Sequence, residues 1–189
     1  MRIGTKILLF GTHNFLLHPL LVLVATRIIW GCWPGWRGVV CIMIHDWGYW
    51  GSSHIDGEPQ SDGHPRLGAE IAGCLFGLKY RKVVMYHSRT LAKLDKEQTS
   101  WLCWPDKAFW LLMPNWLISL LCKLSGELQE YEQTPYHCGF GFDPERWKRQ
   151  VDSWLKAEGI DFLGKVPTRW RCLISYKGET DGIEPVSAP

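Results

Sequence analysis

The chain has 189 residues, of which 46% are hydrophobic and 21% are charged. This length suits one domain with a buried core, and this composition excludes a disordered chain. The formal net charge is only +2 and there is no basic stripe, so we expect no stable nucleic-acid complex. Twelve tryptophans and seven histidines are the unusual counts. The histidines indicate a function only if the fold brings them together.

The seven cysteines are widely spaced, and no Cys-x-x-Cys occurs. This pattern excludes a thiolate zinc site and a disulfide framework, and it predicts a reducing, cytoplasmic compartment. Polar residues and proline interrupt the apolar stretches 7–30 and 108–122, which predicts buried helices and no transmembrane segment. Peripheral membrane association through exposed tryptophan stays open. A homo-oligomer also stays open, because 108–122 is apolar on most sides.

In chain order, proline near the start and glycine after the end predict a first helix over 19–30. The next run, 39–46, is too hydrophobic for a surface helix, and its periodicity does not separate a buried strand from a buried helix. Further helices are expected over 65–76, 80–93, 101–112, 116–130 and 144–157. The last of them begins at Pro144, with Asp143 as its N-cap. These elements predict an all-α bundle of about six or seven helices.

Four histidines and two aspartates stand at the ends of these elements or on successive helices. In chain order they are His18, His45, Asp46, His64, His87 and Asp106. A lone histidine in an apolar stretch is usually an ordinary core residue. A helical bundle, however, could bring these six side chains to one place.

This order, H … HD … H … H … D, resembles the HD-domain superfamily of metal-dependent phosphohydrolases. Segment 18–25 (HPLLVLVA) resembles the family's first-helix motif, and 42–48 (IMIHDWG) resembles its apolar run followed by His-Asp-x-Gly. Segment 64–72 (HPRLGAEIA) is similar to the His-Pro-x-x-Gly-Ala of members with larger metal sites, and 104–107 (WPDK) resembles the closing Ala-Asp-Lys. The resemblance covers about residues 13–130.

The resemblance implies an HD-domain helical bundle as the fold. We expect a metal-binding core over 1–135, a C-terminal helical extension over 136–177 packed on the same domain, and a loose tail over 178–189. The sequence departs from the family where a lysine often follows the His-Asp-x-Gly, since residues 49–51 here are Tyr-Trp-Gly. The link before the His-Asp pair is also short, which makes His13 an alternative first ligand.

The resemblance also implies the activity, a metal-dependent phosphohydrolase. Such hydrolysis needs an activated water and neutralised phosphoryl charge, and a divalent metal supplies both. Imidazole and carboxylate ligands suit Mn, Co, Fe, Ni or Zn, as one or two ions. The primary site would consist of His18, His45, Asp46 and Asp106. His64 and His87 would ligate a second metal with Asp46 bridging, or they would bind phosphate and protonate the leaving group.

Two neighbouring ligands raise a geometric question. His45 and Asp46 would point about 100° apart on a regular helix, so they share a site only if that helix ends nearby. We expect Gly48 to supply the ending as the residue after the C-cap. For the first ligand, Pro19 favours His18 over His13 because it places His18 at a helix start.

The substrate is expected to be a small phosphorylated molecule, a (deoxy)nucleotide above all. Candidate phosphate contacts are Lys107, Arg89, Lys82 and Arg66, of which Lys107 adjoins a ligand. At least two of the four are expected to be ordinary solvated charges. Trp47 and Trp50 follow the His-Asp pair and would either stack on a base or pack in the protein.

Two other functions stay open. HD-fold diiron oxygenases share the same residue order and cleave C–C or C–P bonds with two irons and oxygen. A degenerate HD fold would instead serve as a non-catalytic binding module, and the intact ligand set argues against that reading.

Overall fold

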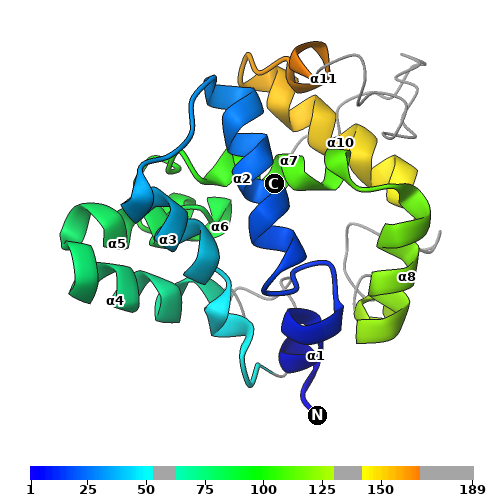
Figure 1. Ribbon diagram of the computed structural model, residues 1–189, viewed down its shortest axis with the longest axis horizontal. Helices are drawn as coiled ribbons and strands as arrows, with labels where there is room; N and C mark the ends of the chain where they lie inside the picture. The colour runs from blue at the N-terminus through cyan, green and yellow to red at the C-terminus, as the bar shows by residue number, and fades with distance from the viewer. Residues whose placement is uncertain (53–62, 130–141, 167–189) are drawn as a thin grey trace.

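The computed structural model describes residues 1–52, 63–129 and 142–166 (Figure 1). These residues form α-helices joined by short links, with one 3-10 turn and no strand among them, so the predicted all-α class is confirmed. The described helices are more numerous and shorter than the six or seven expected. They are α1 (Ile3–Phe10), α2 (Leu17–Trp30), α3 (Trp36–Ile44), η1 (Trp47–Tyr49), α4 (His64–Phe76), α5 (Leu78–Met85), α6 (Arg89–Leu94), α7 (Cys103–Leu112), α8 (Asn115–Ser125), α10 (Pro144–Ala157) and α11 (Phe162–Lys165).

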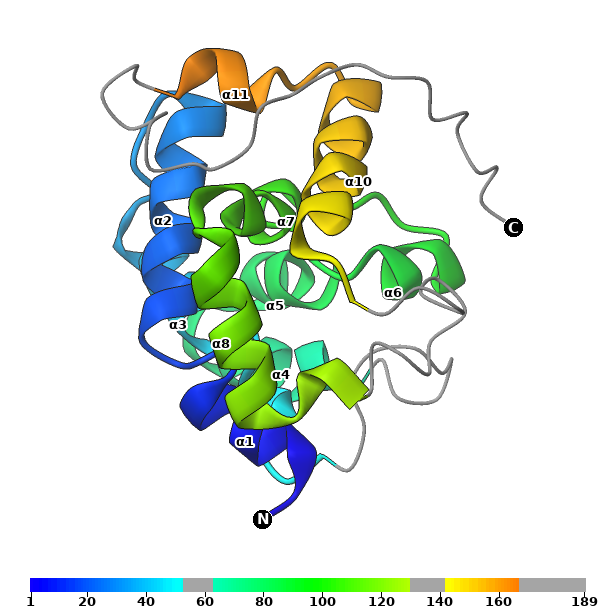
Figure 2. The same ribbon diagram turned by 90° about the vertical axis from the view of Figure 1, so that its right-hand side faces the viewer.

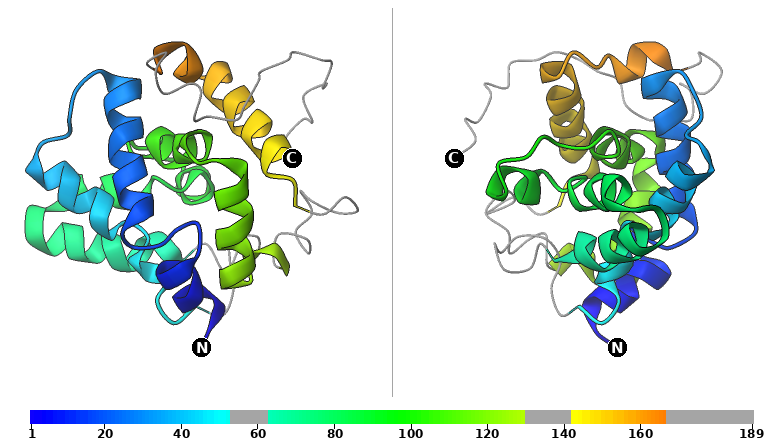
Figure 3. Two further views of the ribbon diagram at one scale, coloured as in Figure 1. Left: turned by 45° about the vertical axis from the view of Figure 1, so that its right-hand side comes forward. Right: turned by 90° about the vertical axis from the view of Figure 1, so that its left-hand side faces the viewer.

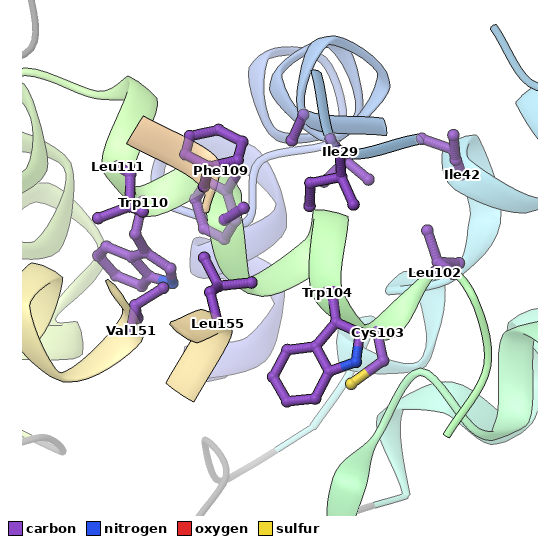
Figure 4. Close-up of a cluster of buried hydrophobic side chains, with 14 of the residues drawn as sticks. Ile29, Ile42, Leu102, Cys103, Trp104, Phe109, Trp110, Leu111, Val151 and Leu155 are labelled. Atoms are coloured by element: carbon purple, nitrogen blue, oxygen red, sulfur yellow. The ribbon is translucent and has the colours of Figure 1, made fainter. Parts of the chain in front are cut away.

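Helix α7 lies at the centre of the bundle. It packs against both α2 and α10, and Figure 2 shows α10 beside it. Phe109 and Trp110 of α7 belong to the same buried cluster as Val151 and Leu155 of α10 (Figure 4). Removing these apolar side chains from water holds the two helices together. This core therefore fixes the position of Asp106, which lies in the first turn of α7.

The other helices lie on two sides of this centre. Helices α3 to α6 gather on one side, and α8 lies on the other with α1 at its lower end (Figures 1 and 3). Helix α4 packs closely on α5, and α1 packs on α8. Among the described residues no single helix is long and apolar enough to cross a membrane, and the one pair that would reach that length together, α7 and α8, is bent by 109°.

The apolar run 39–46, which was ambiguous in the sequence, is helical up to Ile44. It belongs to α3, which packs against α2, α4 and α5 and buries Cys41 and Ile42 among them. Contact with helices on several sides explains why the run is too hydrophobic for a surface helix.

The single helix expected over 80–93 is two helices. Helix α5 ends at Met85, and α6 begins at Arg89 after Ser88, whose side chain accepts a hydrogen bond from the Leu91 amide. A serine N-cap satisfies an amide that has no partner inside the helix, and so it starts a new helix here. The break leaves His87 in the link between the two helices.

Helix α10 begins where the sequence predicts. The Asp143 side chain accepts a hydrogen bond from the Glu145 amide, with Pro144 as the first helical residue. The division into a core over 1–135 and an extension over 136–177 stays a prediction. The tail expected over 178–189 lies outside the described residues.

Candidate metal centre

Six side chains from helix ends converge in the interior of the bundle. They are His18 near the start of α2, His45 and Asp46 directly after α3, His64 at the start of α4, His87 between α5 and α6, and Asp106 in the first turn of α7. All six are buried. The fold thus brings together every residue that the sequence nominated as a metal ligand, apart from the alternative His13.

Two of the histidines are oriented by the ends of the helices that precede them. His45 Nδ1 donates a hydrogen bond to the Ile42 carbonyl oxygen at 2.7 Å, and His87 Nδ1 donates to the Val84 carbonyl oxygen at 2.6 Å. These carbonyls belong to the last turns of α3 and α5, where helix carbonyls lack partners within the helix. Because a carbonyl can only accept, Nδ1 carries the proton in both rings, and Nε2 of the neutral ring presents a lone pair.

Two glycines allow the ligand-bearing segments to approach one another. A Cβ atom at Gly48 would lie 2.0 Å from the His64 carbonyl oxygen, and one at Gly68 would lie 2.2 Å from the Ile44 carbonyl oxygen. Only a residue without Cβ fits at these distances. The expectation that Gly48 ends the preceding helix is wrong, because α3 already ends at Ile44 with His45 as its C-cap. This earlier ending frees the His45-Asp46 pair from helical geometry.

The first set of ligands, which we call the primary group, consists of His18, His45, Asp46 and Asp106. His18 Nε2 lies 3.1 Å from Asp46 Oδ2 and 3.2 Å from Asp106 Oδ1. His45 Nε2 lies 3.0 Å from His18 Nε2 and 3.2 Å from Asp106 Oδ1. All four donor atoms lie within 4.8 Å of one another, so the group could hold a metal ion.

The second set, which we call the secondary group, consists of Asp46, His64 and His87. The two histidine Nε2 atoms lie 3.2 Å apart, and Asp46 Oδ1 lies 3.7 Å from that of His64 and 3.5 Å from that of His87. This group could also hold a metal ion. Asp46 belongs to both groups and turns a different oxygen toward each, Oδ2 to the primary group and Oδ1 to the secondary group.

The charges of the two groups differ. Burial by itself lowers the pKa of His18, but hydrogen bonds to Asp106 and Asp46 outweigh it and raise that pKa to about 9. Burial by itself raises the pKa of Asp46 and of Asp106. His45 and His18 attract the Asp46 carboxylate and hold its pKa well below the usual range. Lys107 and the same two histidines do this for Asp106, whose pKa is also held well below the usual range.

In the secondary group, burial lowers the pKa of His87. Its ring is therefore neutral at physiological pH, which is the form of histidine that binds metals. The primary group thus combines two ionised carboxylates with a protonated His18, whereas the secondary group presents a neutral His87.

The donor set fits a divalent cation. His45 Nε2 and His87 Nε2 each face another imidazole nitrogen, at 3.0 and 3.2 Å. Asp46 Oδ2 is buried, with His18 Nε2 at 3.1 Å and His45 Nε2 at 3.5 Å. Lone pairs at these distances repel unless a proton or a cation lies between them. In the metal-free protein the proton on His18 relieves part of this repulsion, and a bound cation would relieve the rest.

Of the two candidates for the first ligand, His18 lies in the primary group and His13 lies beside it. The group of donor atoms contains His18 and not His13. The ring of His13 instead packs against that of His18, with centroids 4.9 Å apart, and its Nδ1 lies 3.2 Å from Thr12 Oγ1.

Two aromatic residues that support the ligands were not identified in these roles from the sequence. The buried Tyr49 ring stacks on His64 with centroids 4.6 Å apart and planes 2° from parallel, and Phe109 packs edge-on against His18 at 4.3 Å. These contacts restrain the ligand rings in rotation. The only signal for Tyr49 was its position three residues after Asp46, and nothing distinguished Phe109 from other core aromatics.

The predicted substrate contacts separate into two sets. Lys107 Nζ donates to Asp106 Oδ2 at 2.9 Å, and the Arg89 guanidinium lies over the rings of Trp104 and Trp154 at 5.6 and 4.9 Å from their centroids. Both cations therefore adjoin the first turn of α7. By contrast, Lys82 pairs with Glu97 on the exposed surface.

The remaining three candidates, Arg66, Trp47 and Trp50, have exposed side chains. Their part in substrate binding stays a prediction.

Comparison of the chain with protein-family models, with curated proteins and with solved structures gave no match.

Proposed function

We propose that the protein is a metal-dependent phosphohydrolase of the HD-domain type. It would act on the phosphoester or phosphoanhydride bond of a small substrate, a (deoxy)nucleotide above all. The observation that carries the proposal is the position of Asp46, whose two oxygens face two separate groups of buried ligands. A shared carboxylate of this kind is typical of two-metal hydrolytic sites.

A divalent metal, when bound, lowers the pKa of a bound water and neutralises charge on phosphoryl oxygens. The primary group supplies two carboxylates and two imidazoles for one ion. Of the two roles open to the secondary group, the neutral ring of His87, anchored on the Val84 carbonyl, favours metal ligation over phosphate binding and proton donation. We therefore propose two ions per chain, with Asp46 between them.

Lys107 is the best candidate for binding the substrate phosphate. Its ammonium touches the buried Asp106 oxygen, and its side chain is 26% exposed, so it links the ligand group to solvent. Arg89 would bind a more distant phosphate, because its two indole neighbours hold the guanidinium in place. Trp47 and Trp50, exposed after the His-Asp pair, are candidates for stacking on a base.

The test combines metal analysis with activity. We expect two transition-metal ions per chain by elemental analysis, and phosphate or pyrophosphate release from one or more members of a nucleotide panel in the presence of Mn, Co or Ni. Asp46→Ala should abolish both metal binding and release. Two bound irons with oxygen consumption and no phosphate release would instead identify an oxygenase. Neither activity with metal present would indicate a binding module.

A further inference from the structure

Exposed apolar side chains follow one face of α8. Trp116, Leu120 and Leu124 are spaced four residues apart, so they lie above one another on the helix. Their exposed fractions are 67%, 44% and 59%. A helix that packs only by its other side would normally carry polar residues here.

A second set of exposed apolar side chains lies on the segment that joins α1 to α2 and on the adjoining turns. Its members are Phe10, Phe15, Leu16 and Leu20. This segment adjoins the end of α8, since Thr12 Oγ1 donates to the Glu127 carboxylate at 2.9 Å and α1 packs on α8. Figures 1 and 3 show the lower end of α8 beside α1. We call these four residues together with Trp116, Leu120 and Leu124 the α1–α8 face.

The segments that form this face contain basic residues and no acidic ones. Residues 1–45 and 107–126 include no Asp or Glu, although the whole chain has 19. Arg2, Lys6 and Lys123 lie on these segments at or beside α1 and α8. Apolar and positive side chains are thus present together on these segments, which carry no acidic side chain of their own.

We propose that the α1–α8 face docks on an anionic phospholipid surface. Trp, Phe and Leu side chains would enter the boundary between headgroups and acyl chains, and the basic residues would attract the anionic headgroups. A second copy of this chain fits the face less well. A two-fold contact would bring its basic residues together with no carboxylate of the face to pair with them.

The test is sedimentation of the full chain with phosphatidylcholine vesicles that either contain or lack phosphatidylserine. We expect binding to the anionic vesicles, weakened by salt, and much less binding to the neutral ones. The variant Lys123→Gln/Leu124→Ser should reduce partitioning by about tenfold or more, because it removes one charge and one inserted side chain.

The chain offers a matched control for this variant. Leu78 and Lys79 of α5 are adjacent and exposed, with Leu78 exposed to 65%, so Leu78→Ser/Lys79→Gln makes the same chemical change elsewhere. The control should bind like the unmodified chain, and circular dichroism should show both variants folded. Equal loss in both variants, or no preference for anionic vesicles, would overturn the proposal. So would a dimer in light scattering that the α8 variant alone dissociates, because the face would then be a subunit interface.

Discussion

The two halves of the candidate metal centre share Asp46 but differ in the charge around them. The primary group has a second carboxylate, Asp106, and a histidine, His18, whose pKa is raised to about 9. The secondary group has one Asp46 oxygen and His87, whose pKa is lowered by burial. Cations are held most strongly where buried negative charge is concentrated. The primary group should therefore keep an ion under conditions in which the secondary group releases one.

Removal of the shared carboxylate should have the largest effect. Asp46→Ala takes an oxygen from each group, so we expect loss of both ions in elemental analysis and a fall in kcat of at least about a thousandfold. Asp152→Ala is the control, because Asp152 is an equally buried aspartate that pairs with Lys156 on α10. If Asp46→Ala keeps its full metal content, the shared role of this residue is disproved.

Single histidine replacements should then separate the two groups. His18→Gln should lose the tightly held ion and cost about a thousandfold in kcat, whereas His64→Gln should retain about one ion per chain after dialysis and cost about a hundredfold. Metal content and kcat measured on the same samples provide the check. Equal metal loss in both variants would show that the groups do not differ in affinity.

The metal-free protein should show the difference as a pH dependence of stability. A histidine whose pKa rises on folding stabilises the protein below its unfolded value of 6.5, and this contribution is lost as the pH rises through about 9. We therefore expect the unfolding free energy of chelator-treated protein to fall across this range, by on the order of 3 kcal/mol from His18.

Among the residues that the structure describes, two other buried groups titrate in the same window and require a control. Burial raises the pKa of Glu127 to about 7 and lowers that of Lys148 to about 8. Metal-free His18→Gln retains both of these groups, so the difference between its unfolding curve and that of the unmodified chain reports His18 together with its attraction for Glu127 and the neighbouring carboxylates. Parallel pH profiles for the two proteins would contradict the assignment of a raised pKa to His18.

The smallest expected effect concerns the secondary group alone. Tyr49→Leu removes the ring that stacks on His64, and we expect about a tenfold loss of activity with the tightly bound ion retained. Tyr80→Leu changes a partly buried tyrosine of α5 that contacts Arg37 rather than a ligand, and it should leave activity unchanged. Loss of all metal from Tyr49→Leu would mean that the two groups are not separable.

The sequence predicted which side chains converge better than it predicted the bounds of the helices. The order of the four histidines and two aspartates was readable because each stands at a helix start, a helix end or a break. The prediction of a single helix over 80–93 was wrong, because Ser88 caps a new helix and this capping competes with continuation of the first one. The sequence pattern alone does not show whether the serine caps a new helix or the first helix continues.

Features that depend on close approach between distant segments could not be predicted from the sequence. The sequence predicted that Gly48 ends a helix. In the structure Gly48 instead lies so close to the His64 carbonyl that there is no room for a Cβ atom. The surface pairing of Lys82 with Glu97 depends on the turn of the chain after α6. Local spacing carries neither kind of information, because both contacts arise only when the helices pack.

We propose that the Asp46 carboxylate is shared by two metal ions, and anomalous diffraction tests this most directly. Crystals grown with Mn and measured at a wavelength sensitive to that metal should give two peaks. One should lie among His18, His45, Asp46 Oδ2 and Asp106, and the other among Asp46 Oδ1, His64 and His87. Partial chelation should remove the second peak first. The absence of any peak beside Asp46, or metal bound only elsewhere in the molecule, would contradict the shared role of Asp46.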